Sequence, residues 1–173
     1  MGSFNPSKKL IYDGIRKVWV KATPEEVVRQ RWLMRMVKQL DFPHELIAIE
    51  KTMKELPGMR SKAVPDRRVD ILCYGKGDSS TDVLFPLLLI ECKAGNLPEE
   101  AVDQVIGYNY HVGAGFVAAV NLHEVRLGAF DSVSNNYAFC SFLPSFRELM
   151  RGLKRCLHEH GSVHSFQGPI HDL

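Results

Sequence analysis

The sequence has no apolar stretch long enough to cross a membrane. The longest, residues 83–90, is far shorter than the roughly 20 residues that a spanning helix needs. Residues 1–10 lack the apolar core of a secretory signal peptide. The four cysteines stand far apart and form no C-x-x-C pair, so the pattern does not indicate a disulfide scaffold. These absences predict a reduced, cytoplasmic protein that is not associated with a membrane.

Signatures of several enzyme classes are also missing. There is no G-x-x-x-x-G-K-[ST] phosphate loop and no G-x-S-x-G serine elbow. With 22 basic and 20 acidic residues, the net charge of +2 is too small to require a polyanionic partner, although a local basic patch would suffice for one. The 173 residues fit one domain and leave no room for an ATPase motor, while 45% hydrophobic residues allow a full core.

Local patterns predict three helices. The first begins after Thr23, a favourable N-cap, with Pro24 in the first helical position and acidic residues in the first turn. Apolar residues then recur at helical spacing until about residue 40. The second helix covers residues 96–111 and is ended by Gly113 and Gly115, and the third covers residues 144–157.

Short apolar runs between turn residues predict strands at 44–54, 69–74, 84–93, 116–120 and 125–130, with a further edge strand at 137–142. Helix, three strands, helix, two or three strands and helix therefore follow one another. This order predicts an α/β fold with a mixed central sheet flanked by helices. We expect one domain at residues 21–157, an N-terminal extension at 1–20 and a C-terminal tail at 158–173.

The candidate catalytic residues are charged side chains at the ends of two predicted strands. Asp70 lies near a strand start, and Glu91-Cys92-Lys93 close the most apolar strand. Residues two apart in a strand share a face, so Glu91 and Lys93 point the same way and Cys92 points oppositely. If Asp70 lies on the neighbouring strand, two carboxylates converge beside a lysine. Carboxylate oxygens, with the Cys92 carbonyl as a further ligand, suit Mg²⁺, which would activate a water for attack on a phosphate.

Four segments together resemble a known family. They are TPEEVVRQ at 23–30, RRVDIL at 67–72, LIECKA at 89–94 and QVIGY at 104–108. In order and spacing they resemble the N-terminal nuclease domain of the type I restriction enzyme R subunit, within the PD-(D/E)XK nuclease superfamily. The resemblance runs from about residue 18 to residue 130.

The resemblance implies a restriction-endonuclease-like αβββαβ core and hydrolysis of DNA phosphodiester bonds with Mg²⁺, for which Mn²⁺ could substitute. It makes Asp70 and Glu91 metal ligands and Lys93 the catalytic lysine. Gln104 and Tyr108 match the family's Q-x-x-x-Y motif, which assists site geometry and DNA contact. They are four residues apart on the second predicted helix and share a face.

Two departures from the family pattern stand out. Val69 precedes Asp70 where the family's name motif has proline, and a literal Pro65-Asp66 pair lies just upstream. We prefer Asp70 because an apolar strand follows it directly, whereas Asp66 lies in a basic loop. The family domain normally leads a motor, which this chain lacks. A separate motor or specificity protein is therefore an expected partner besides DNA, and a homodimer that cuts both strands stays open.

Other residues have two interpretations. The family places a helix glutamate near the metal, which would be Glu26, but Thr23 and Glu26 also form a capping box. Arg29, Arg67 and Arg68, with three further basic residues, could line a phosphate-binding groove or a solvated loop; these three are Lys54, Arg60 and Lys62. A cysteine and histidines near the C-terminus superficially suggest metal spacing, although a flexible tail explains them better; they are Cys156, His158, His160 and His164. For the whole chain, the alternative to a nuclease is an inactive module of the same fold that binds DNA or a protein partner.

Overall fold

The computed structural model describes residues 9–57, 63–77 and 83–160 of the chain. Arg60, Lys62, the side chains of Cys156, His158 and His160, and the whole of residues 161–173 lie outside the described part. The C-terminal cysteine and histidine group noted in the sequence therefore lies outside the described residues.

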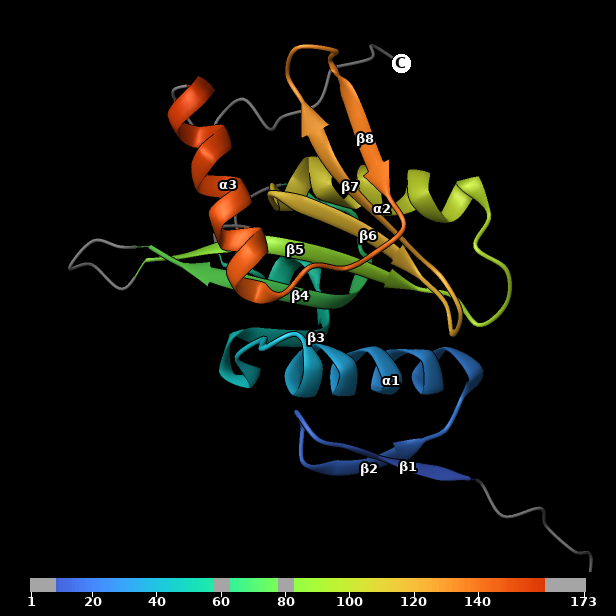
Figure 1. Cartoon of the computed structure of the whole chain (residues 1–173). Coiled ribbons are helices and arrows are strands. Elements are labelled where there is room, and N and C mark those ends of the chain that lie inside the picture. Colours follow the sequence, from blue (N-terminus) through green and yellow to red (C-terminus); the bar gives the residue numbers. More distant parts are fainter. Residues whose placement is uncertain (1–8, 58–62, 78–82, 161–173) are drawn as a thin grey trace, which may run out of the picture.

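The described chain contains three α-helices and a six-stranded mixed sheet (Figure 1). In chain order the elements are β1 (Leu10–Asp13), β2 (Val18–Lys21), α1 (Pro24–Gln39), the 3₁₀ turn η1 (His44–Leu46), β3 (Ile47–Thr52), the 3₁₀ turn η2 (Met53–Glu55), β4 (Arg68–Lys76), β5 (Leu84–Cys92), α2 (Glu99–Val112), β6 (Phe116–Val120), β7 (Val125–Asp131), β8 (Asn136–Cys140) and α3 (Phe146–His160). The predicted mixed α/β class is confirmed, and α1 to β6 follow as helix, three strands, helix, strand.

The large sheet has its strands in sequence order from β3 to β8. Only β5 and β6 are parallel, and α2 is the connection between them, because parallel neighbours need a crossover. The other neighbours pair antiparallel, so the start of β4 lies beside the carboxyl end of β5. This topology places the predicted acidic residues side by side at the ends of two neighbouring inner strands.

Helices cover both faces of the sheet. On one face, α1 and α3 pack over alternate residues of the central strands, including Ile71, Ile90 and Ala118. On the other face, α2 packs over the residues between them, such as Leu72 and Leu89. Because β5 is covered on both faces, its last six residues, 87–92, are buried, which explains its almost continuous apolar run.

Local chemistry fixes the start of α1 and the end of α2 where the sequence predicted them, whereas α2 begins at Glu99 instead of at residue 96. The Thr23 hydroxyl accepts a hydrogen bond from the Glu26 amide (3.2 Å) and caps α1. Gly113 ends α2 in the left-handed conformation, with φ of 69°. Pro86 lies near the start of β5, next to the register shift between Cys73 and Tyr74 on β4, where a proline is tolerated in a sheet.

Two parts of the chain differ from the sequence prediction. Residues 44–54 form a strand only at Ile47–Thr52, because 3₁₀ turns occupy both ends; Thr52 and Glu55 form a capping box that starts the second turn. The N-terminal extension, for which we predicted no structure, contains the antiparallel β1–β2 hairpin on the outer side of α1 (Figure 1). Its strands are only four residues long, too short for a clear periodic signal.

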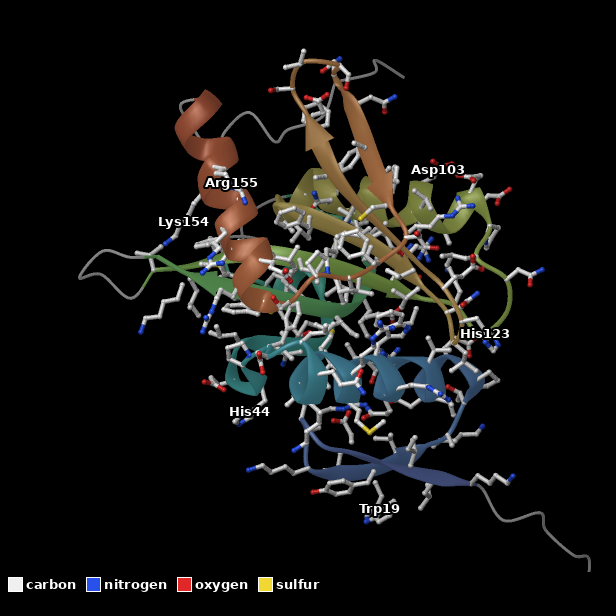
Figure 2. The ribbon with its side chains drawn as sticks, in the orientation of Figure 1. Trp19, His44, Asp103, His123, Lys154 and Arg155 are labelled. Carbon is white, nitrogen blue, oxygen red and sulfur yellow. The ribbon has the colours of Figure 1, made fainter. Side chains whose placement is uncertain are left out.

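The hairpin and α1 enclose an open, mainly apolar groove of about 910 Å³. Exposed apolar side chains border it: Trp19, which projects from the hairpin in Figure 2, is 66% exposed, and Met34 is 62% exposed. The groove lies on the side of α1 away from the sheet and does not include the predicted catalytic residues. Across the described residues, none of the helices has the length and apolar character of a membrane span.

Candidate active site

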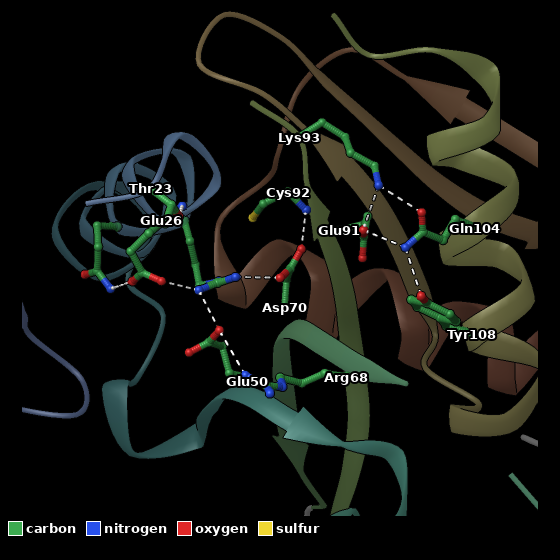
Figure 3. Close-up of polar contacts among 12 residues, drawn as sticks. Thr23, Glu26, Glu50, Arg68, Asp70, Glu91, Cys92, Lys93, Gln104 and Tyr108 are labelled. Atoms are coloured by element: carbon green, nitrogen blue, oxygen red, sulfur yellow. Dashed lines mark hydrogen bonds and ion pairs between the residues drawn. The ribbon is translucent and has the colours of Figure 1, made fainter. Parts of the chain in front are cut away.

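The charged residues of β4 and β5 meet where the regular pairing of these strands ends. The last backbone pair on this side is Ile71 with Ile90. Beyond it, the Cys92 amide donates to Asp70 Oδ2 (2.8 Å), so the Asp70 side chain takes the place of a backbone carbonyl in the ladder (Figure 3). Asp66, by contrast, lies exposed in the preceding loop. The preference for Asp70 over Asp66 therefore agrees with the geometry.

Glu91, in β5, and Lys93, directly after the strand, point the same way, as their spacing predicted. Lys93 Nζ lies 3.0 Å from Glu91 Oε1 and donates to Gln104 Oε1 (2.8 Å). Gln104 Nε2 in turn donates to Glu91 Oε1 (2.7 Å) and to the Tyr108 hydroxyl (2.9 Å). Lys93, Glu91, Gln104 and Tyr108 thus form one hydrogen-bonded group between β5 and α2 (Figure 3). Cys92 points to the opposite face, where it is buried in the core beneath α1.

Asp70 and Glu91 are close enough for their charges to interact. Burial raises the pKa of Glu91, the negative charge of Asp70 raises it further, and hydrogen bonds from Lys93 and Gln104 partly oppose both effects. Burial also raises the pKa of the Cys92 thiol well above its usual value. The carboxylate of Glu91, with its raised pKa, beside the negative charge of Asp70 creates a place where a cation is favoured.

Arg29 connects Asp70 to α1. Its Nη2 donates to Asp70 Oδ1 (2.7 Å), and its Nη1 pairs with Glu26 and lies 3.3 Å from Glu50 Oε1. The Arg29 side chain is only 7% exposed, and its Nε is buried without a partner in the described part of the chain. Burial acts to lower the pKa of Arg29, but the carboxylates, Asp70 foremost, outweigh it and raise that pKa.

The remaining predicted residues fall into two groups. Glu26 lies on α1 among Arg16, Arg29 and Gln30, and Arg29 stands between it and Asp70. Arg67 and Arg68 are exposed at the start of β4, where a nucleic acid could reach them. The guanidinium of Arg29 is enclosed by carboxylates and pairs with them in this structure. The contact of Arg29 with a DNA phosphate stays a prediction.

Sequence reasoning missed Glu50 and Arg16. Glu50 lies on β3 between Ile49 and Lys51, whose partners on β4 flank Asp70. Its carboxylate contacts three arginines, Arg16, Arg29 and Arg68. It has φ of 49°, which is unusual for a non-glycine residue within a strand. The sequence placed it only within the strand predicted at residues 44–54. Arg16 lies in the turn of the hairpin that we did not predict.

The donor chemistry of this region fits a hard cation. Among the described residues, no three or more His, Cys, Asp or Glu side chains come together as a metal site. The carboxylates of Asp70 and Glu91 and the main-chain carbonyl of Cys92 offer oxygen ligands. Mg²⁺ needs only one or two carboxylates, because it keeps several waters. The cluster around them contains five carboxylates and four cationic side chains, namely Asp13, Glu26, Glu50, Asp70 and Glu91 with Arg16, Arg29, Arg68 and Lys93.

Fold and site together define a mixed α/β domain with an acidic pair and a lysine at the ends of adjacent central strands. The family model described as the type I restriction enzyme R protein N terminus (HSDR_N) matches residues 24–144. The chain belongs to this family, which is consistent with a nuclease domain. The match begins at α1 and ends before α3, so the β1–β2 hairpin lies outside it. No curated protein and no solved structure matches the chain.

Proposed function

We propose that this protein is a metal-dependent nuclease with a restriction-endonuclease-like core that hydrolyses phosphodiester bonds in DNA. The observation that carries the proposal is the meeting of Asp70 and Glu91 beside Lys93 in a chain of this family. The excess of one negative charge in the surrounding cluster supports a cation between the two carboxylates.

Asp70, Glu91 and the Cys92 carbonyl would hold Mg²⁺ or Mn²⁺. When bound, the ion lowers the pKa of a coordinated water and neutralises charge on the phosphate. Lys93 lies close enough to Glu91 to orient the attacking water or to stabilise charge on the phosphate oxygens. Gln104 holds both Lys93 and Glu91 through its amide, so it fixes their separation. The carboxylate of Glu26, which the sequence also suggested as a metal ligand, forms ion pairs with Arg16 and Arg29.

DNA would approach from the side where basic and aromatic groups are accessible. Exposed Arg67 and Arg68 would contact phosphates, and Tyr108 would contact the backbone or a base beside the lysine. Other subunits of a restriction complex, including a motor or specificity protein, are the expected partners, with a cytoplasmic location. A homodimer would allow both strands to be cut.

The decisive experiment combines ion binding with cleavage. Mn²⁺ binding is measured by electron paramagnetic resonance, and cleavage is followed on linear, circular and branched DNA with RNA as a comparison. We expect Mg²⁺-dependent cleavage of DNA by the wild type and its loss in Asp70→Asn and Glu91→Gln, while Asp66→Asn, a change at the exposed neighbouring aspartate, keeps it. Wild-type protein that binds no ion and cuts no DNA would instead support an inactive module that binds DNA or a protein partner.

A further inference from the structure

A continuous chain of ion pairs runs from the N-terminal hairpin to Asp70. Arg16, in the hairpin turn, pairs with Asp13 (2.5 Å), Glu26 (3.2 Å) and Glu50. Glu26 and Glu50 then hold Arg29, and Arg29 holds Asp70. The hairpin, α1, β3 and β4 each contribute to this chain, so its geometry is set by the tertiary fold.

The guanidinium of Arg29 occupies the middle of three carboxylates. Glu26 and Glu50 contact its Nη1, and Asp70 contacts its Nη2. The side chains of Arg29 and Glu26 are each only 7% exposed, so water screens this charge poorly. Three acidic groups in such surroundings need a positive charge among them, and Arg29 supplies it.

Glu50 shows that this arrangement is imposed by the fold. A left-handed φ of 49° costs a glutamate energy, and such strain persists only when surrounding contacts hold the residue in place. The contacts here are the ion pairs of the Glu50 carboxylate with Arg16, Arg29 and Arg68. The backbone distortion aims the carboxylate at Arg29, and Arg29 is thereby fixed against Asp70.

Asp70 keeps one side for a metal ion. Its Oδ1 accepts from Arg29 and its Oδ2 from the Cys92 amide, and each carboxylate oxygen retains a second lone pair. Glu91 approaches from the α2 face, whereas Arg29 approaches from α1. The Asp70 carboxylate would therefore lie between the Arg29 guanidinium and an ion held by Asp70 and Glu91.

We propose that Arg29 is a positioning residue that serves as a built-in cation: it orients Asp70 and occupies the place that a second divalent ion would take among Glu26, Glu50 and Asp70. The site then binds one divalent ion, between Asp70 and Glu91. This inference rests on the proposed nuclease function, because it assigns the ion count of the same site. It also makes Glu26 a partner of Arg29 instead of a metal ligand.

The test counts bound Mn²⁺ by electron paramagnetic resonance in the whole chain without DNA. The wild type is expected to bind one ion per chain. Arg29→Met leaves the cluster with one more uncompensated negative charge and is expected to bind two ions, whereas Arg29→Lys restores a positive charge and returns the count to one. Arg35→Met is the matched control, because Arg35 is an exposed arginine of the same helix that stacks on Trp32. It keeps one ion.

Each outcome separates the two proposals. Two ions in the wild type, or one ion in a folded Arg29→Met variant, overturns the role of Arg29 and leaves the nuclease proposal standing. A wild type that binds no ion without DNA overturns the single-ion site, and it removes the nuclease proposal as well if the protein also cuts no DNA. If Arg29→Met does not fold, the wild type and Arg29→Lys decide: one ion in both supports the inference, and two ions in either overturns it.

Discussion

Replacement of Lys93 by methionine separates the catalytic role of the lysine from any structural role. Lys93 Nζ contacts Glu91 Oε1 at 3.0 Å and Gln104 Oε1 at 2.8 Å, and its side chain is 30% exposed. Methionine keeps an unbranched stem that packs along the same surface but removes the ammonium group. Glu91 retains its hydrogen bond from Gln104, so it is not left without a partner.

The expected changes in stability and activity differ in size. Because Lys93 is partly exposed, solvent screens its ion pair, and the loss of the pair costs about 0–1 kcal/mol of unfolding free energy. A lysine that orients the attacking water or stabilises phosphate charge contributes on the order of 100-fold to the rate, about 2.7 kcal/mol of activation free energy. Activity should therefore fall far more than stability.

The assay pairs urea denaturation with DNA cleavage in Mg²⁺. Lys21→Met, a change at an exposed lysine of β2, serves as the control and is expected to alter neither quantity by much. Lys93→Met with cleavage within about threefold of the wild type would refute the reasoning that gives the ammonium a role in the reaction. A loss of several kcal/mol of stability would instead show that Lys93 holds the strand end together.

Three further outcomes test other parts of the structure. Burial acts to raise the pKa of Asp13, but hydrogen bonds from the following turn lower it, so Asp13→Asn should cost about 2 kcal/mol near pH 7 in urea titrations. The wild type should be more stable than Asp13→Asn by the full amount above the unfolded-state pKa of Asp13, about 3.8, and this difference in unfolding free energy should disappear as pH falls through the lower folded-state pKa. A difference in stability that stays constant down to about pH 2 would contradict the lowered pKa. Trp32→Phe removes the indole donor to the Asn121 carbonyl (2.7 Å), and thermal melting should reveal a loss of about 1–3 kcal/mol, whereas an unchanged melting temperature argues against that bond. Burial raises the pKa of Cys73 to about 12, so mass spectrometry after brief thiol labelling at pH 8 should find Cys140 modified and Cys73 protected; equal labelling would contradict the burial.

Much of the fold could be predicted because it depends on local chemistry. Thr23 and Gly113 mark helix ends through capping and left-handed backbone geometry, which short segments encode. The continuous apolar run of β5 reflects burial on both faces, and the strand period places Glu91 and Lys93 together. These features need no knowledge of which segments are neighbours in space.

Other features depend on which segments pair, and local patterns do not carry that information. The contact of Asp70 with the Cys92 amide exists only because β4 runs antiparallel beside β5. Arg29 gave the same signal in the sequence as the exposed arginines of the predicted groove, yet its guanidinium is enclosed.

The sequence by itself determined the class of fold, the helix ends and the acidic and basic groups at the strand ends, because propensity and periodicity act over a few residues. Only the tertiary structure decided that Glu50 and the hairpin residue Arg16 hold Arg29 against Asp70. The physical reason is that buried charges must find partners, and those partners come from four elements that the chain brings together only when it folds.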